Sequence, residues 1–269
     1  KIERTWFAAD KTGSHLLHTL FQTSIQYPQI QRFDEHFVLD ILVDDDHARG
    51  MVAMNMMEGT LVQINANAVV IATGGGCRAF KFNTNGGIVT GDGLSMAYRH
   101  GVPLRDMEFV QYHPTGLPNT GILMTEGCRG EGALLRNKDG EAFMERYAPT
   151  LKDLAPRDFV SRSMDQEIKE GRGCGPQGDY VVLDMTHLGV DTIMKRLPSV
   201  YEIGKNFANV DITKEPIPVV PTIHYQMGGI PTNIHGQVVM PDLEAGTDAE
   251  GLYAEQKIVK GLYAIGECS

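Results

Sequence analysis

The chain has 269 residues, of which 42% are hydrophobic and 22% charged, and its formal net charge is −10. This length can supply one large domain or two smaller ones with sizeable cores. The acidic balance argues against a general affinity for nucleic acid or for an anionic membrane surface. No apolar run approaches the roughly 18 residues of a membrane span, and no basic stretch followed by an apolar one suggests a signal peptide.

The four cysteines are far apart in the sequence and form no CxxC or Cys/His ligand pattern. Such sparse spacing favours free thiols in a reducing compartment over a disulfide framework or a zinc site. We therefore expect no metal site. The chain begins without methionine and stops just after an apolar run, so we expect a piece of a longer domain, cut at both ends.

Hydrophobic periodicity predicts the elements of the first hundred residues. The run 67–73 (NAVVIAT) is short and continuously apolar, and it ends in three glycines, as expected of a strand buried on both faces. The expected elements, in chain order, are a helix over 13–27, strands over 36–43, 48–57, 61–64 and 67–73, and a glycine-rich loop opening a helix within 86–100.

From Leu104 onward the chain changes to long polar loops and amphipathic helices, with helices expected over 157–170 and 192–207. Strand-like segments return from Gln237, and the closing run 260–266 mirrors the earlier apolar strand that delivers glycines. This order predicts an α/β domain, formed by residues 1–110 and 233–269, that is interrupted by an inserted α+β domain over 111–232.

Three segments place glycines and polar side chains where strands end or a helix begins. They contain Thr73 and Gly74, Asp92 between two glycines, and Glu267 after Gly266. Backbone N–H groups at such places bind cofactors at the carboxyl edge of a sheet, and an acid there can accept hydrogen bonds from ribityl or ribose hydroxyls. Ordinary tight turns explain each segment equally well. No complete GxGxxG follows a strand, so a dinucleotide site would be only partly encoded in this chain.

The segment 123–132 (LMTEGCRGEG) concentrates a hydroxyl, two acids, an arginine and three glycines in ten residues. Such a set can form a hydrogen-bonded relay or a tight anion site, although a solvated loop with incidental salt bridges is the alternative. His113 in QYHPTG and His224 in PTIHYQMGGI stand in proline-bounded turns. Either histidine could equally be structural, and Arg157 in APRD could serve only helix capping and ion pairing.

Taken together, these residues point to one kind of ligand. Hydrogen-bond donors suited to a small dicarboxylate come from His113, His224, Thr125, Arg129 and Arg157. Guanidinium groups pair with carboxylates in a bidentate geometry, as such a substrate requires. Glu126, with the arginines, could carry protons.

Five motifs in this order and spacing resemble the flavoprotein subunits of succinate dehydrogenases and fumarate reductases: QYHPTG, LMTEGCRGEG, APRD, VDITKEPIPVVPTIHYQMGGIPT and AIGECS. The resemblance runs through essentially the whole chain. TWFAADKTG, HTLFQTS and NMMEGT are closer to fumarate reductases, whereas RYAPTLKDLAPRD and EIKEGRGCGP are closer to succinate dehydrogenases. The preferred direction of the reaction therefore stays open.

The resemblance implies a partial FAD-binding domain with a Rossmann-like sheet, interrupted by a capping domain, with the dicarboxylate held between them. It implies that Arg157 is the proton donor or acceptor and that Glu126 and Arg129 form a proton relay. The implied substrate contacts are His113, Thr125, His224 and Tyr225, and His113 also joins the catalytic set. The implied FAD contacts are Thr73, Gly74, Asp92, Glu267 and the backbone of His36, Phe37 and Val38.

The resemblance also implies an iron–sulfur subunit that exchanges electrons with a quinone pool, and membrane anchor subunits contacted indirectly. The expected location is peripheral, on the cytoplasmic face of the inner membrane, with a role in the tricarboxylic acid cycle or in anaerobic respiration. The family's glycine-rich dinucleotide turn, its FAD-linking histidine and a downstream substrate arginine lie outside this chain. Two alternatives remain open: an L-aspartate oxidase-like flavoenzyme, and a catalytically inactive fragment of the flavoprotein.

Overall fold

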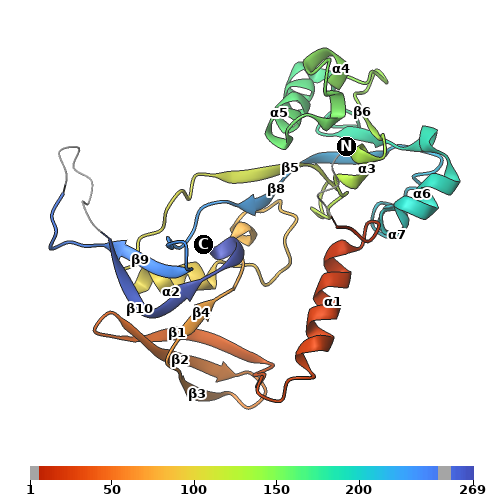
Figure 1. The fold of residues 1–269 in the computed structure, drawn as a ribbon. Helices are drawn as coiled ribbons and strands as arrows, with labels where there is room; N and C mark the ends of the chain where they lie inside the picture. Colours follow the sequence, from red (N-terminus) through yellow and green to blue (C-terminus); the bar gives the residue numbers. More distant parts are fainter. Residues whose placement is uncertain (1–5, 248–255) are drawn as a thin grey trace. The chain divides into compact units, whose positions relative to one another are not determined.

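The computed structural model describes residues 6–247 and 256–269, and Figure 1 shows its elements. The chain divides into two compact units. Unit 1 comprises Lys1–Gln31, Phe82–Thr84 and Tyr112–Ile223, and unit 2 comprises Arg32–Lys81, Asn85–Gln111 and His224–Ser269. The chain passes from unit 2 to unit 1 after Gln111 and returns after Ile223, nine residues before the predicted boundary at 232, and its first 31 residues belong with unit 1. The predicted domain assignment itself stays a prediction.

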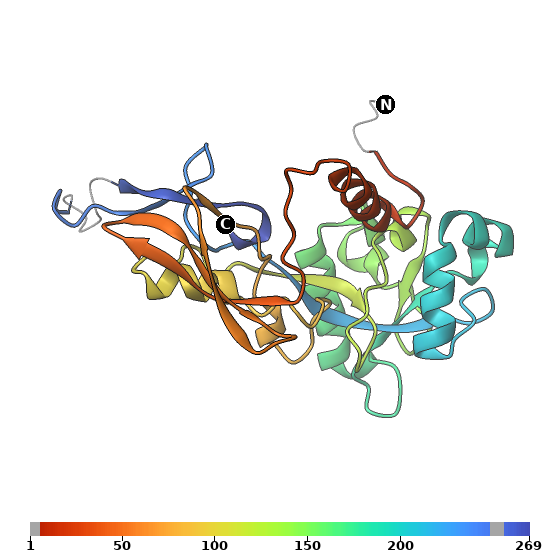
Figure 2. The same ribbon diagram turned by 90° about the horizontal axis from the view of Figure 1, so that it is seen from below.

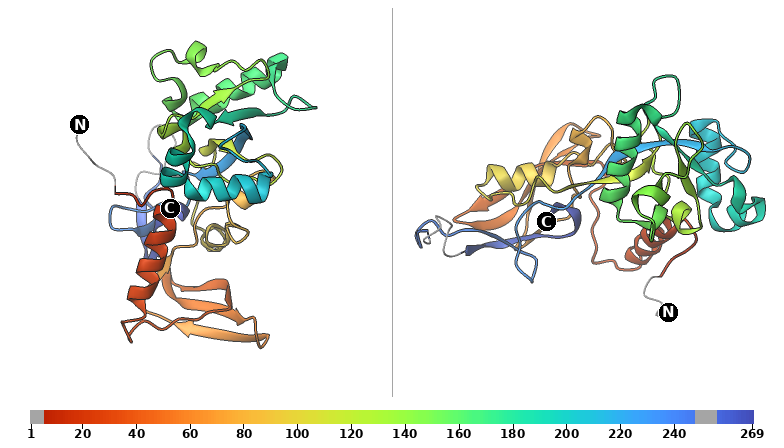
Figure 3. Two further views of the ribbon diagram at one scale, coloured as in Figure 1. Left: turned by 90° about the vertical axis from the view of Figure 1, so that its right-hand side faces the viewer. Right: turned by 90° about the horizontal axis from the view of Figure 1, so that it is seen from above.

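Unit 2 opens with an antiparallel meander, formed by β1 (His36–Asp44), β2 (His47–Asn55) and β3 (Thr60–Asn65). The left panel of Figure 3 shows these strands in orange. Asp45 and Asp46 join β1 to β2 with φ angles of 48° and 53°. Positive φ at both central residues is the signature of the two-residue turn that matches the twist of a hairpin, and aspartate tolerates this conformation.

A second group of strands in unit 2 brings distant parts of the chain together. β10 (Gln256–Ala264) runs parallel to β4 (Val69–Ile71), with Leu262 opposite Val69, and antiparallel to β9 (Gln237–Pro241). The two apolar runs that were predicted to bring glycines to one place, 67–73 and 260–266, thus lie side by side as paired strands. The expected burial of β4 on both faces is wrong, because Val70, between the buried Val69 and Ile71, is 53% exposed. Residues 248–255, within the predicted strand-rich segment, lie outside the described residues.

The core of unit 2 forms between the sheet and the helix α2 (Asp92–Arg99). Figure 2 shows α2 in yellow beside β1. Leu94 and Ala97 of α2 pack with Ile41, Val69 and Leu262 of the strands, and all five are buried. The helix predicted within 86–100 is therefore confirmed. It begins after Gly91, whose φ of 80° suits a residue without a Cβ.

Unit 1 is built on a four-stranded sheet in the order β5 (Val110–Gly116), β8 (Ile217–Gln226), β7 (Val181–Asp184) and β6 (Leu134–Arg136). Leu135, Leu183, Ile217, Phe143 and Met164 are fully buried in its core. The helices of unit 1 are α1 (Thr12–Ser24), α3 (Gly127–Gly130), α4 (Met144–Tyr147), α5 (Arg157–Glu167), α6 (Val190–Arg196) and α7 (Pro198–Ile203). Other helical turns of unit 1 lie at η2 (Lys152–Leu154), η3 (Ile168–Arg172), η4 (Thr186–Leu188) and η5 (Gly204–Ala208), and those of unit 2 at η1 (Cys77–Ala79) and η6 (Gly266–Cys268).

Two of the helix predictions in unit 1 are confirmed and one is wrong. The predicted helices over 13–27 and 157–170 correspond to α1 and α5, each ending three residues early. The helix predicted over 192–207 is interrupted, because Leu197 leaves the helical region with φ −131° and Pro198 starts α7. Proline lacks the N–H that a continuing helix needs, but it is favoured in the first turn of a new one. Among the helices in the described residues, none is long and apolar enough to cross a membrane.

Candidate functional site

In unit 1, strand β5 contains the buried histidine His113. His113 is 1% exposed, and its Nδ1 accepts a hydrogen bond of 3.2 Å from the backbone N–H of Thr115. An accepting Nδ1 places the proton of the neutral ring on Nε2, as inferred from the hydrogen-bond network. Nε2–H is the donor that a carboxylate ligand would need. The extended backbone expected before Pro114 is confirmed by its place in β5.

Thr115 joins β5 to the segment that carries the predicted relay. Its hydroxyl donates to the carbonyl of Met124 at 2.6 Å, and its carbonyl accepts from the Met124 N–H at 2.8 Å. A bridge between Gly116 and Leu123 continues this pairing. Since Thr125 and Glu126 follow Met124 directly, these bonds fix both residues beside the strand that holds His113.

Glu126 lies between two arginines. Its Oε2 is 2.8 Å from Nε and 2.6 Å from Nη2 of Arg157, at the first position of α5. Its Oε1 is 3.4 Å from Nη2 of Arg129, an ion-pair distance at which the hydrogen-bond geometry is not met. Glu126 and Arg129 are neighbours because they are three residues apart in the turn that forms α3. The structure therefore brings the three predicted relay residues into one row.

Burial makes Arg129 unusual among arginines. Its side chain is fully buried, and its Nη1 donates to the backbone carbonyl of Asp153 at 2.6 Å. Burial lowers the pKa of this guanidinium because the charged form loses water, and the charge of Arg157 acts in the same direction, whereas Glu126 and Asp153 oppose the shift. A guanidinium in such a setting gives up its proton more readily than a solvated one.

The row can therefore move protons and hold an anion. The carboxylate of Glu126 contacts both arginines and is 43% exposed, so it can accept a proton from one side and deliver it to the other. Arg157 is 30% exposed and is the outer member of the row. Its guanidinium can pair with a ligand carboxylate or donate a proton to a nearby carbon.

Unit 2 gathers three of the predicted cofactor residues at the carboxyl edge of the β4–β10 pair. The side-chain Oε1 of Glu267 accepts from the backbone N–H of Gln226 at 3.0 Å, and Oε1 of Gln226 accepts from the N–H of Gly76 at 3.1 Å. A Cβ on Gly75 would lie 2.6 Å from the Glu267 carboxylate. Thr73, Gly74 and Glu267 are thus brought to one place through strand pairing.

Helix α2 begins at the same edge. A Cβ on Gly93 would lie 2.1 Å from Oγ1 of Thr73, so only glycine permits this approach of α2 to the end of β4. Asp92 stands at the first position of α2 and accepts from the Thr90 hydroxyl at 2.9 Å. A cavity of about 310 Å³ opens beside these glycines and is lined by residues that include Gly76, Gly91 and Gln226.

These features fit a dinucleotide better than they fit ordinary turns. Close backbone approach at glycines, a helix start and an acid at a sheet edge are the elements that cofactor sites of α/β proteins share. The remaining predicted cofactor residues, His36, Phe37 and Val38, begin β1, with Phe37 45% exposed. Their contact with a cofactor stays a prediction.

His224 and Tyr225 lie near the end of β8, in the part of the chain that belongs to unit 2. The carbonyl of His224 accepts from Nδ2 of Asn85 at 2.8 Å, and Tyr225 is 40% exposed. Their role as substrate contacts stays a prediction. Three residues of the two sites were not predicted from the sequence: Thr115, Asp153 and Gln226. Thr115 lies in the QYHPTG motif and could have been found there. Asp153 lies in the RYAPTLKDLAPRD segment, in which nothing singles it out as a site residue.

The chain matches the FAD binding domain family over residues 1–269. It is 63% identical to the fumarate reductase flavoprotein subunit of Haemophilus influenzae over 100% of this chain and 44% of the relative. It is 53% identical to the succinate dehydrogenase flavoprotein subunit of Rickettsia felis, over 99% of this chain and 43% of the relative. The chain thus spans less than half the length of these relatives.

Among solved structures, a quinol–fumarate reductase with menaquinol molecules superposes with a TM-score of 0.88 and 59% identity, over 100% of this chain and 45% of that one. The Escherichia coli quinol fumarate reductase gives 0.86 and 57%, over the same shares. The chain therefore belongs to the FAD binding domain family, and over its whole length it is similar to the flavoprotein subunits of fumarate reductases and succinate dehydrogenases.

Proposed function

We propose that this chain forms part of a flavoprotein that interconverts fumarate and succinate. The observation that carries the proposal is the row Arg157–Glu126–Arg129, in which one carboxylate contacts two guanidinium groups, one of them buried. The similarity to fumarate reductase and succinate dehydrogenase flavoproteins supports the same reaction.

In the proposed reaction, Arg157 donates a proton to one alkene carbon of fumarate, and it accepts that proton when succinate is oxidised. Glu126 then passes a replacement proton from Arg129 to Arg157. His113 and Thr125, held beside the row by β5, bind a substrate carboxylate, and His224 and Tyr225 complete the proposed substrate contacts. Fixed donors at the carboxylate where negative charge develops lower the barrier.

FAD, when bound, supplies or accepts the hydride. The residues proposed to hold it are those of the unit 2 sheet edge: Thr73, Gly74, Asp92 and Glu267, with the backbone of 36–38. Their support is the glycine cradle, in which a Cβ on Gly75 or Gly93 would meet a neighbouring side chain at 2.6 Å or less.

The wider organisation is also part of the proposal. Residues 111–232 form a capping domain, and the remainder belongs to a split FAD-binding domain. Electrons pass to an iron–sulfur subunit and onward to a quinone, with membrane anchor subunits reached through it. Both solved structures described above are quinol–fumarate reductases, which supports electron exchange with a quinone. We further propose a peripheral position on the cytoplasmic face of the inner membrane.

The test replaces Arg157 in the full-length protein that carries this chain, loaded with FAD. Arg157→Gln and Arg157→Lys should abolish the fumarate-dependent oxidation of a reduced viologen dye, while fumarate still perturbs the flavin absorption spectrum. The matched control is Arg162→Gln, on the same helix, because Arg162 is 71% exposed and pairs with the exposed Asp158. We expect the control to retain normal turnover.

The factor by which turnover falls in Arg157→Gln decides whether Arg157 is the proton donor. If Arg157→Gln keeps turnover within about tenfold, the barrier has changed by only about 1.4 kcal/mol, and the role of proton donor is refuted. If the wild-type protein binds FAD but turns over neither fumarate nor succinate, the proposed reaction itself is refuted.

A further inference from the structure

We propose that Asp153 is a positioning residue of the relay: its backbone carbonyl holds the guanidinium of Arg129, and its carboxylate both anchors the segment that leads into α5 and supplies a counter-charge to Arg129. This inference rests on the proposed function for its effect on turnover. Its effect on the geometry of α3 can be tested independently.

Asp153 contacts the buried arginine of the relay and shortly precedes the helix that carries the other arginine. Its carbonyl accepts from Nη1 of Arg129 at 2.6 Å, and its Oδ1 accepts from the backbone N–H of Leu135, in β6, at 2.9 Å. Asp153 lies in η2, four residues before Arg157. One residue therefore ties together the buried arginine, the sheet and the approach to the helix that carries the proton donor.

Several polar atoms at this place lack hydrogen-bond partners among the described residues. They are Oδ2 of Asp153, and Nε and Nη2 of Arg129, all of them buried. Buried polar groups are nearly always hydrogen-bonded, so unbonded ones call for an explanation. An aspartate used only to anchor a turn would not need to sit beside a guanidinium that is itself incompletely bonded.

The charges around the pair favour mutual stabilisation. The titratable groups that act on Arg129 are Glu126, which directly precedes α3, Cys128 of α3, Arg157 of α5 and Asp153 of η2. Burial raises the pKa of the Asp153 carboxyl, and the Leu135 N–H and the charge of Arg129 oppose the shift. The other acid that acts on Asp153 is Glu145 of α4, which pairs with Lys152 at 2.6 Å.

Removing the negative charge of Asp153 therefore makes Arg129 easier to deprotonate. In the direction of fumarate reduction, Arg129 must be protonated to resupply Arg157 through Glu126. A lower pKa of Arg129 means that this proton is lost at a lower pH. The alkaline limb of the rate profile should then move toward neutral pH, with little change in KM.

The test compares Asp153→Asn and Asp153→Ala in the full-length, FAD-loaded protein. Asparagine keeps an oxygen acceptor for Leu135 but removes the charge. We expect it to shift the alkaline limb of kcat by about one pH unit downward, the effect of losing one nearby opposite charge. Alanine also removes the acceptor, and hydrogen exchange at the amides of residues 126–130 should become about tenfold faster or more.

The control is Asp184→Asn, another aspartate of unit 1 that is 8% exposed, bonded to Thr186 and paired with Arg136. It should leave the pH profile and the exchange of 126–130 unchanged. A wild-type pH profile for Asp153→Asn would overturn the counter-charge, and unchanged exchange in Asp153→Ala would overturn the positioning. An inactive wild-type protein would refute the proposed reaction, while the exchange measurement would still decide whether Asp153 positions α3.

Discussion

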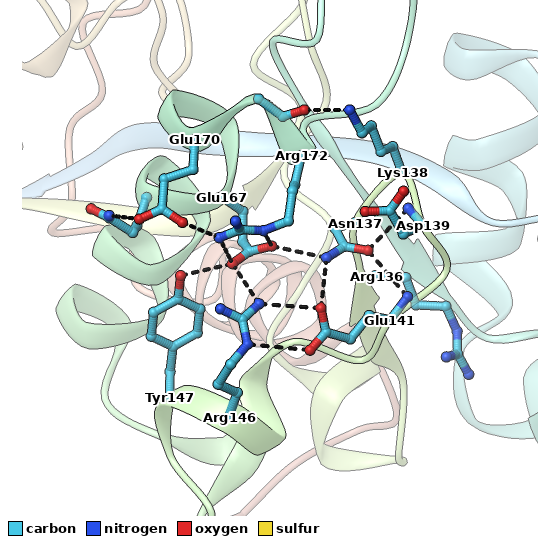
Figure 4. Close-up of polar contacts among 12 residues, drawn as sticks. Arg136, Asn137, Lys138, Asp139, Glu141, Arg146, Tyr147, Glu167, Glu170 and Arg172 are labelled. Carbon is cyan, nitrogen blue, oxygen red and sulfur yellow. Dashed lines mark hydrogen bonds and ion pairs between the residues drawn. The ribbon is translucent and has the colours of Figure 1, made fainter.

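Glu167 is the most heavily bonded carboxylate among the described residues, and its replacement should loosen the helices around α5. Its side chain is fully buried at the end of α5. It accepts two hydrogen bonds from Arg172, at 2.7 and 2.8 Å, and one each from Arg146, Tyr147 and Asn137 at 2.7–2.9 Å. Figure 4 shows these donors converging on it. They belong to α4, to η3 and to the turn after β6, so one carboxylate joins three segments to α5.

The magnitude follows from the pKa. Burial alone would raise the pKa of Glu167, but the hydrogen bonds, led by those from Arg172, lower it from 4.5 to about 2. A difference of this size corresponds to about 3 kcal/mol in favour of the folded state. Breaking a buried ion pair typically costs about 3–5 kcal/mol, which agrees. Glu167→Gln keeps the shape of the side chain but turns an amide NH₂ toward guanidinium donors. We therefore expect the free energy of unfolding to fall by about 3 kcal/mol.

Hydrogen–deuterium exchange of the full-length protein can localise this loss. The amides of α4 and α5 should exchange about 100-fold faster in Glu167→Gln, since each 1.4 kcal/mol of opening free energy is about a factor of ten. The matched control is Glu170→Gln. Glu170 also pairs with Arg172, but its side chain is 43% exposed. In Glu170→Gln, exchange of the α4 and α5 amides should therefore change by about twofold at most. A change below about tenfold in Glu167→Gln, or an equal change in the control, would refute the reasoning.

The other predictions concern acid stability and the cofactor edge. Because folding lowers the pKa of Glu167, the contribution of Glu167 to the stability of the folded state is complete above about pH 4.5 and is lost as the pH falls toward 2. Between these pH values, the stability of the wild type should therefore fall more steeply than that of Glu167→Gln. Acid unfolding followed by circular dichroism measures this difference. Gly93→Val should abolish FAD retention after desalting, because its Cβ would lie 2.1 Å from Thr73, whereas Gly87→Ala, with no atom within 4 Å of its Cβ, should retain FAD. Retention by Gly93→Val would show that α2 need not approach β4.

Much of the fold could be predicted because it is encoded locally. Hydrophobic alternation gave the meander of β1 to β3 in the right order, and glycine runs predicted where β4 ends and α2 begins. The errors arose where context overrides local pattern. Val70 lies in a continuously apolar run, yet whether its face is covered depends on elements elsewhere in the structure. Pro198 lies within the helical pattern predicted over 192–207, yet its backbone starts a new helix.

The residues of the two sites also differ in whether local sequence could predict them. Glu126 and Arg129 could be grouped from sequence, because three residues of helical spacing place them side by side. Arg157 could be added only as a further donor for the same ligand, since 31 residues separate it from Glu126, and its role as proton donor or acceptor came from the resemblance to a family. Thr115 and Gln226 contribute through bonds to backbone groups of distant segments, and such bonds leave little trace in composition.

Asp153 shows most clearly where sequence reasoning ends. The group that holds the buried guanidinium of Arg129 is a backbone carbonyl, which every residue type possesses. No substitution at position 153 removes that acceptor, so only the path of the chain through η2 brings it to the relay. The side chain matters because it fixes this path by bonding to Leu135, and because it adds one negative charge at a buried place. The comparison of asparagine with alanine at this position separates the two contributions, since only the charge is lost in the first and both are lost in the second.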